Sequence, residues 1–328
     1  RFAWRGDDLE LDILHRLGQF YIQAKNVKAG LNTLSRAVQL YPNSPMIPGI
    51  RAQMADIFRD VFLSDLGNDL SPLDALTLYQ QYRSLMPGGS DGIAVMRNLA
   101  ERLVQIDLLD QAAGLLEDLV KNALQGDEKG RVSARLAAIR LLDHKPEQAM
   151  AGLDLAPSTT YPADLQNERT LLRAKALSEL KKYDEAIALL NSNSSNPAKL
   201  LRADIDMRAQ RWKDASVALI DLIGPAPTGT ALSQDQAQWL VNCAIAVSMA
   251  GDTAGLEKLR ADYGPAMASL PQNDTFRMLT EPEKTEQSRD IAAAQAKIAD
   301  VDMFQGFLNS YRQDRAPPPK GPRKSSTP

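Results

Sequence analysis

Residue types that build catalytic and metal sites are scarce in this chain. Its 328 residues include one cysteine and two histidines. A single cysteine excludes an internal disulfide and is too little for a structural zinc site. The two histidines, His15 and His144, lie far apart, and the zinc-binding spacing His-Glu-x-x-His is absent. We therefore expect no metal centre and no cofactor.

Long apolar runs and a dominant charge are missing as well. The longest apolar candidate, 239–250, is shorter than the roughly 18 to 20 residues that a membrane-spanning helix needs, and it carries Asn242 and Ser248. With 38 basic and 41 acidic residues, the formal net charge is −3. No strong field therefore favours nucleic acid or an anionic membrane. We expect no nucleic-acid partner and no direct membrane insertion.

Catalytic motifs are also absent from the sequence. There is no Gly-x-Ser-x-Gly nucleophile turn and no phosphate-binding loop of the Walker type. The glycine-rich run 86–90 follows an expected helix and lacks the lysine that a phosphate loop requires. Acidic pairs such as Asp7-Asp8 fall at helix starts, where carboxylates stabilise the helix. We predict that the chain is not an enzyme.

The residues that are abundant favour helices. Hydrophobic residues make up 44% of the chain and aromatic residues only 5%. Alanine and leucine dominate the apolar set, whereas the valine and isoleucine runs of buried strands are missing. The predicted fold class is all-α. Cys243 lies in the apolar run 240–245 and is expected to be a buried core thiol.

A pattern of helical hairpins returns at nearly constant spacing. Anchored on one small residue per copy, it passes through Gly30, Ala75, Ala112, Ala149, Ala186 and Ala215. The steps between these positions are 45, 37, 37, 37 and 29 residues. The longer first step is expected to come from an inserted link at 64–69. Such a period is typical of a stacked-helix solenoid, a fold that usually binds rather than catalyses.

The first copy is the clearest. It reads Leu14-x2-Leu17-Gly18-x2-Tyr21, followed by Gly30-x3-Leu34, Ala37 and Pro42. Two small residues, Gly18 and Gly30, are expected to let the paired helices approach closely, and Pro42 is expected to end the second helix. These spacings resemble the tetratricopeptide repeat, with leucine in place of the usual tryptophan and glycine in place of the usual alanine. The resemblance covers residues from about 9 to 265.

The resemblance implies a right-handed α-solenoid of about seven hairpins over residues 9–265. In the seventh, which turns at Gly251, the register of the small residue is open between Ala254 and Gly255. Residues 266–313 are predicted to form a linker and a terminal helix, with the helix beginning near Glu283. Residues 314–328 are rich in proline and basic residues and are predicted to be a disordered tail.

The terminal helix has two interpretations. In the first it caps the apolar face of the last repeat, as solenoids require. In the second it presents Phe304, Phe307 and Leu308 on an exposed face that dimerises the protein or docks on a partner. In that case, polar replacement of the two phenylalanines would give monomers.

In tetratricopeptide arrays the first helix of each pair lines a concave groove that holds a peptide or a helix. Carried over by position, the resemblance implies a partner-binding groove that includes His15, Gln19, Arg97, Glu101, Arg131, Lys175, Asp204 and Arg208. Further lining positions are Asp12, Ile22, Gln23, Val104, Gln105, Ala134, Ala138, Leu141, Glu168, Leu171, Ser178, Leu200 and Met207. The alternative for any one of these residues is a solvated helix face without a ligand.

The implied groove favours one kind of partner. It mixes charges, unlike a nucleic-acid track, and has Glu101 one turn after Arg97, where chaperone-binding members have asparagine. Its apolar members predict a protein segment with hydrophobic anchors. The predicted function is a non-catalytic scaffold or adaptor. The alternatives are homo-oligomerisation through the terminal helix and a regulatory domain of an enzyme whose catalytic part lies upstream.

The compartment stays open at this stage. The chain begins at Arg1 in mid-pattern and is interpreted as a piece of a longer protein, so a signal or anchor would lie upstream. In style it resembles the C-terminal repeat region of large bacterial tetratricopeptide proteins, some of them associated with motility and cell-envelope machinery. That resemblance implies the periplasm if an anchor precedes the repeats; the cytoplasm is the alternative.

Overall fold

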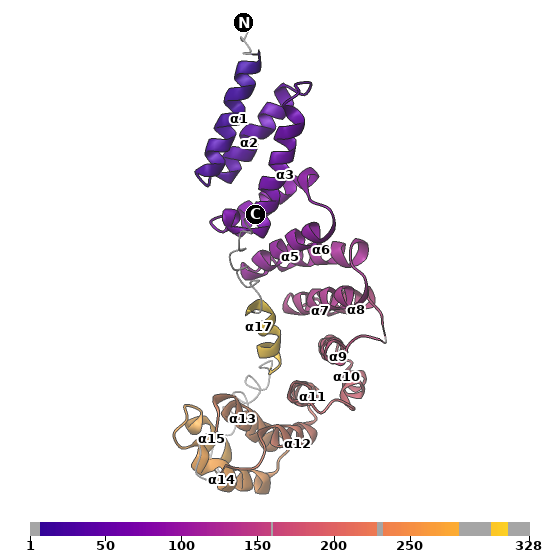
Figure 1. Cartoon of the computed structure of the whole chain (residues 1–328). Helices are drawn as coiled ribbons and strands as arrows, with labels where there is room; N and C mark the ends of the chain where they lie inside the picture. The colour runs from indigo at the N-terminus through magenta and orange to yellow at the C-terminus, as the bar shows by residue number, and fades with distance from the viewer. Residues whose placement is uncertain (1–6, 159, 228–231, 282–302, 314–328) are drawn as a thin grey trace, which may run out of the picture. The chain divides into compact units, whose positions relative to one another are not determined.

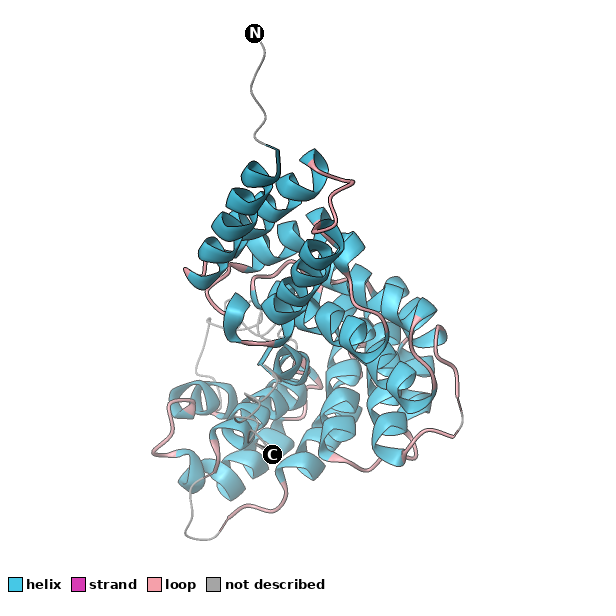
Figure 2. Ribbon diagram, turned by 45° about the horizontal axis from the view of Figure 1, so that its top comes forward, coloured by secondary structure: helices cyan, strands magenta, loops and turns pink. Residues whose placement is uncertain are grey.

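The computed structural model describes residues 7–158, 160–227, 232–281 and 303–313. These residues form sixteen α-helices and two short 3-10 helices, and no strand occurs among them (Figures 1 and 2). The all-α prediction is therefore confirmed. The predicted tail at 314–328 and the part of the predicted terminal helix before residue 303 lie outside the described residues.

The chain divides into two compact units between Val132 and Ser133, inside one helix. The described part of the first unit contains α1 (Asp7–Gln23), α2 (Val27–Leu40), α3 (Ile47–Leu63), η1 (Asp65–Gly67), α4 (Pro72–Gln81), η2 (Arg83–Leu85), α5 (Gly89–Gln105), α6 (Leu109–Asn122) and the start of α7 (Gly126–Leu142). The second unit contains the rest of α7, then α8 (Pro146–Asp154), α9 (Ala163–Glu179), α10 (Tyr183–Leu190), α11 (Asn196–Arg208), α12 (Trp212–Ile223), α13 (Gln234–Met249), α14 (Thr253–Met267), α15 (Asn273–Thr280) and α17 (Gln305–Gln313).

Helices that follow one another in the chain pack together in both units. In the first unit α1 packs on α2, α2 on α3, and α5 on α6. In the second, α9 packs on α10, α11 on α12, and α12 on α13. This nearest-neighbour packing agrees with the expected series of hairpins, in which each helix buries its apolar stripe on the next.

Six hairpins share the same turn between their helices. In the first, Lys25 has φ 59°; its N–H donates to the carbonyl of Ile22, and the next N–H, of Asn26, donates to the carbonyl of Tyr21. These two bonds satisfy carbonyls that the helix end leaves unpaired, in the pattern of a Schellman motif. The same left-handed residue and bond pair recur at Asp107, His144, Lys181, Gln210 and Gly251.

In five copies the small residue lies five positions after this left-handed residue. Gly30 is buried, and a Cβ atom on it would lie 2.4 Å from the Ile22 Cδ1 atom. Ala112, Ala186 and the other alanines of the series are 0% exposed. The predicted close approach of paired helices is confirmed. In the seventh hairpin Leu256 takes this position, and neither Ala254 nor Gly255 does, which is why the sequence left its register open.

The second hairpin, α3 and α4, has a different connection. The 3-10 helix η1 lies between its helices, within the expected inserted link. Gly67 at its end is buried so closely that a Cβ atom would lie 2.0 Å from the carbonyl oxygen of Val61. The insertion therefore accounts for the long first step of the pattern, as predicted.

The end of the second unit differs from expectation. Helices α11 to α15 share one apolar cluster, in which Cys243 and Phe276 are 0% exposed, confirming the buried thiol. Packing of α15 on both α13 and α14 covers the last hairpin. Helix α15 lies in the predicted linker, so that part of the prediction is wrong, whereas capping by the terminal helix stays a prediction because its residues before 303 lie outside the described residues. The sequence around Pro271 had suggested a link without a helix.

Candidate binding site

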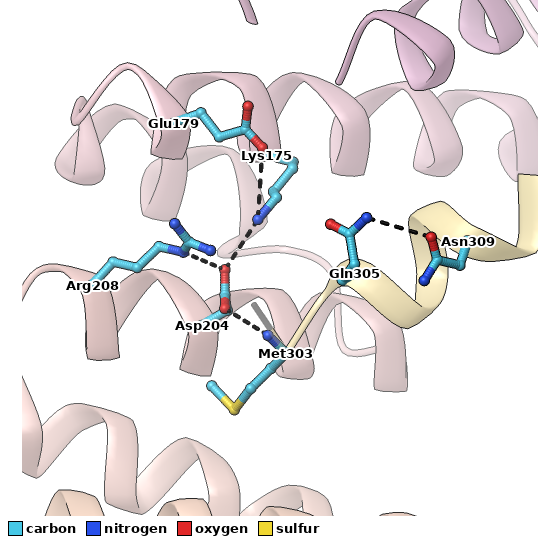
Figure 3. Close-up of polar contacts among 7 residues, drawn as sticks. All are labelled: Lys175, Glu179, Asp204, Arg208, Met303, Gln305 and Asn309. Atoms are coloured by element: carbon cyan, nitrogen blue, oxygen red, sulfur yellow. Dashed lines mark hydrogen bonds and ion pairs between the residues drawn. The ribbon is translucent and has the colours of Figure 1, made fainter. Parts of the chain in front are cut away.

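The candidate site lies where the terminal segment, residues 303–313, meets the first helices of three hairpins of the second unit. Contacts to this segment come from Arg135 on α7, Glu168 on α9 and Asp204 on α11. We call these three residues the docking face. Figure 1 shows where α17, α9 and α11 lie, and Figure 3 shows the contact between Asp204 and Met303 in detail.

Asp204 is the polar centre of the docking face. Its side chain is 1% exposed, and both of its oxygens accept hydrogen bonds (Figure 3). Oδ2 accepts from Arg208 Nε at 2.9 Å and from Lys175 Nζ at 3.4 Å, whereas Oδ1 accepts from the Met303 backbone N–H at 3.0 Å. Lys175, itself 0% exposed, also lies 3.9 Å from Glu179. The buried carboxylate therefore has basic partners on one side and the terminal segment on the other.

The position of Asp204 suits the beginning of a helix. Met303 directly precedes Phe304, whose carbonyl accepts the first backbone bonds of α17 from Phe307 and Leu308. Helix N-termini leave N–H groups without intrahelical partners and carry partial positive charge. The Met303 N–H lies one residue before Phe304 and is not one of these groups, but a carboxylate beside this helix end is favoured by the helix dipole. Asp204 consequently selects the direction in which a helix lies on α11.

An apolar stripe on the terminal segment is buried. Phe304 and Leu308, four residues apart, are 0% and 1% exposed. The ring of Phe307 lies 4.5 Å from that of Phe304 and 5.5 Å from that of Tyr311, measured between centroids. These residues are spaced i, i+3, i+4 and i+7, which places them on one face of a helix. The prediction that Phe304 and Leu308 are exposed for self-assembly is therefore wrong, because the chain buries them itself.

Tyr311 anchors the other end of the segment. Its hydroxyl donates a hydrogen bond to the Glu168 carboxylate on α9. The Arg135 guanidinium on α7 lies 5.5 Å from the centre of its ring, within cation–π range. A phenylalanine would keep the ring contact and lose the hydrogen bond. The docking face thus favours a tyrosine two helical turns after the first buried phenylalanine.

Three of the predicted groove residues come together at this site. Lys175, Asp204 and Arg208 form one hydrogen-bonded group under the start of the terminal segment. Glu168, also among the implied lining residues, bonds Tyr311. The other predicted residues of the first unit lie elsewhere and are described with that unit.

In the first unit, two of the predicted groove residues, His15 and Arg97, contact other helices. His15 Nε2 lies 2.8 Å from Gln53 Oε1 on α3 and 3.0 Å from Gln19 Nε2 on its own helix. Arg97 on α5 forms an ion pair of 3.0 Å with Glu128 on α7. Glu101 is half-buried on α5, and Arg131 is exposed on α7.

Arg135 was missed by the sequence reasoning, as was the role of Tyr311. Arg135 lies one helical turn after Arg131 on α7 and shares its face, which was an available signal. Tyr311 had been taken only as the end of an apolar helix. The contact between them joins positions far apart in the chain, and no local pattern indicates it.

Another carboxyl group near the site is perturbed. Asp206 on α11 is 4% exposed, and its pKa is raised to about 6, mainly by burial and next by the charge of Asp214. The charges of Arg211 and Arg202 act in the opposite direction. Asp206 is therefore a buried acid whose ionisation destabilises the fold at neutral pH. The free energy of unfolding is expected to depend on pH through this residue.

Comparison with known proteins adds no identity. No protein-family model matches the chain, and no curated protein matches it. Within the described residues there is no group of three or more histidine, cysteine, aspartate or glutamate side chains placed to hold a metal ion. In the same residues no helix is long and apolar enough to cross a membrane. The docking face is thus the arrangement on which a functional proposal rests.

Proposed function

We propose that this chain is a non-catalytic scaffold of tetratricopeptide type, in which the docking face of the second unit binds a helical segment of another protein. The observation that supports this proposal is the seat of α17. Side chains from three separate hairpins hold one amphipathic helix at both of its ends. Helix-in-groove recognition works through such spaced anchors.

The sequence resemblance supports the same function. Six hairpins with one turn geometry, five of them with a small residue at a fixed place, are typical of a tetratricopeptide array. The array would then continue through both units as a right-handed solenoid. A role in bacterial motility or cell-envelope assembly belongs to this proposal through the resemblance in style.

Site-specific photo-crosslinking in the native cell tests the proposal. A benzophenone amino acid replaces Asp164, which is exposed on α9 one turn before Glu168 and on the same face. The matched control replaces Val217, which is 68% exposed on α12, the second helix of its hairpin. The expected result is a crosslink to another protein from position 164 and none from position 217.

Mass spectrometry of the crosslinked peptide identifies what is bound. The proposal expects an amphipathic segment with aromatic and aliphatic anchors at helical spacing. Crosslinks that form equally at both positions, or only at position 217, would contradict binding at the docking face. Crosslinks from position 164 that reach only other copies of the chain would favour self-assembly instead.

A further inference from the structure

The terminal segment is seated as a ligand would be. Met303 bonds a residue 99 positions earlier in the chain, and Tyr311 bonds one 143 positions earlier. Helix α17 has only nine residues, fewer than the roughly 12 to 15 that even good helix-forming sequences need in water. It also contains Gly306, an unfavourable helix residue. Its helical form therefore depends on docking.

The contacts define what such a ligand must carry. At its start it offers a backbone N–H to Asp204, and along one face it presents Phe304, Phe307 and Leu308. At its end a tyrosine reaches Glu168 and Arg135. The resulting pattern is aromatic, aromatic, aliphatic and tyrosine at i, i+3, i+4 and i+7. The Asp204 contact fixes its direction.

We infer that the terminal segment is a built-in competitor for the docking face. A partner protein binds there through a helix of the same pattern and direction, and it displaces residues 303–313 when it does so. This inference rests on the proposed function and adds the partner's chemistry and its regulation. A site filled by its own chain binds a partner only in the fraction of molecules in which it is open, so its observed affinity falls in proportion to that fraction.

Features of the segment make displacement feasible. Phe307 and Tyr311 are only half-buried, so its docked surface is incomplete. A Cβ atom on Gly306 would meet no atom within 4 Å, so an alanine there would fit and would strengthen the helix. The segment thus carries a weakness that a partner's helix need not share. Replacing this glycine by alanine should strengthen docking of the segment when made in the chain, and binding of the competing helix when made in that helix.

The test uses a peptide in trans. Its sequence is that of residues 303–313, with an acetylated start so that the Met303 amide N–H remains, and with a fluorescent label at its end. Anisotropy measures its binding to the full chain and to a full-chain double variant, Phe304→Asp with Leu308→Asp, which weakens the competitor. A peptide carrying the same two aspartates is the control ligand.

The expected result is saturable binding to the double variant that is at least about tenfold tighter than to the unmodified chain. Gly306→Ala in the chain should weaken peptide binding by up to about fivefold, and the same change in the peptide should tighten it by about fivefold. The control peptide should not bind either chain. Val217→Asp in the double variant, an exposed change on α12, should leave binding unchanged.

A double-mutant cycle checks the far anchor. Glu168→Leu in the double variant, which leaves no side-chain acceptor, and Tyr311→Phe in the peptide should each weaken binding, by about tenfold for a lost bond to a charged group. Together they should cost little more than either alone, because both remove the same hydrogen bond. Additive losses would mean that the peptide does not lie as α17 does. Asp204 is left intact here because replacing it would remove a partner of buried Lys175.

Besides additive losses in the cycle, three measurements on the purified chain would overturn the inference. The first is a double variant that keeps its circular dichroism spectrum and melting transition yet binds no peptide, which would make α17 a fixed part of the fold. If the double variant fails to fold, hydrogen exchange of the unmodified chain decides. Amides 307–311 that exchange at least about tenfold faster than those of α9 support displacement, and equal rates reject it.

The third result is a mass that doubles with concentration and returns to the monomer value when peptide is added. That would make the displacing helix the terminal segment of a second copy and would overturn the assignment to a partner protein. The crosslinking experiment distinguishes failure of this inference from failure of the proposed function. A partner crosslinked at position 164 whose segment lacks the aromatic pattern would leave the function standing and reject the competitor.

Discussion

Helices α1 and α9 are the first helices of equivalent hairpins in the two units, yet equivalent positions on them differ in burial. Counted back from the turn residues Lys25 and Lys181, Ile13 on α1 corresponds to Arg169 on α9. Ile13 is 53% exposed, whereas Arg169 donates hydrogen bonds to Ser133 Oγ on α7 and to the backbone carbonyls of Leu153 and Ala156 at the end of α8. An apolar side chain is exposed at the place where a charged one is half-buried and hydrogen-bonded.

The stripe on α1 extends beyond one residue. Leu9 and Phe20 on the same helix are 63% and 62% exposed. On α9, by contrast, Lys175 is 0% exposed and bonds Asp204 of the docking face. The comparison teaches that hydropathy along a repeat helix does not decide its burial. What decides is whether a neighbour covers that face, and in the described residues α9 has neighbours that α1 lacks.

The largest expected effect is the difference between replacing a buried phenylalanine and replacing an exposed one. Phe304→Ala should weaken the docking of α17 by about 3 kcal/mol, because a fully buried ring is removed. Phe20→Ala should change the free energy of unfolding by no more than about 0.5 kcal/mol. Hydrogen exchange of residues 307–311 measures the first and denaturant unfolding the second. A large loss at Phe20 would show that α1 is covered in solution.

A second prediction concerns the glycine that the first hairpin has in place of alanine. Gly30→Val should lower the free energy of unfolding by about 3 kcal/mol, since its Cβ atom alone would overlap Ile22. The matched control is Gly49→Val on α3, where a Cβ atom would meet nothing within 4 Å, with an expected change within about 0.5 kcal/mol. Chemical denaturation measures both. Equal effects would mean that the paired helices separate easily.

The third prediction uses pH to probe α11 in the second unit. Because burial raises the pKa of Asp206 to about 6 from 3.8, the folded state holds its proton more tightly than the unfolded state. The stability that the protonated carboxyl provides is present below pH 4 and is lost as pH rises to 6. Asp206→Asn should therefore stabilise the protein by about 2 kcal/mol above pH 6.5.

The control for this prediction is the same variant at lower pH. Below about pH 3, where the carboxyl is largely protonated in both states, Asp206→Asn should leave the melting temperature nearly unchanged. A gain of equal size at pH 4 and pH 8 would mean that the effect comes from packing rather than from ionisation.

The smallest expected effect tests the shared turn. Lys181 has φ 61°, a left-handed conformation that is costly for residues with a side chain. Lys181→Gly should raise the free energy of unfolding by about 0.7 kcal/mol. Its neighbour Lys182, with φ −89°, is the control, and Lys182→Gly should give no gain. Thermal unfolding compares the two, and equal gains would show that the turn geometry is not the cause.

Much of the hairpin series was predictable from the residues. Small side chains at Gly30 and Ala186 marked the helix contacts, and proline at 42 followed the end of α2, as expected. The turns themselves were hidden, since residues such as Lys25 and Asp107 carry no glycine signal for a positive φ. Helix α15 was missed because Pro271 precedes it and the segment is short. Local patterns report local contacts well and irregular connections poorly.

For the candidate site, the sequence indicated the basic and acidic members on α9 and α11 and the amphipathic face of the terminal helix. It did not indicate that the terminal helix contacts these residues. Phe304 and Leu308 show an apolar stripe whose spacing is the same whether it caps a repeat, dimerises or docks on α9 and α11. The choice among these depends on contacts across 99 and 143 positions.

By itself, then, the sequence determined that this protein is helical, built of repeated hairpins and poor in catalytic groups, because composition and periodicity act through neighbours in the chain. The tertiary structure alone decided which face each repeat covers and that the terminal segment lies on the docking face. The physical reason is that burial depends on what arrives from elsewhere in the chain. Asp204 receives the N–H of Met303, whereas the apolar stripe of α1 receives no described helix.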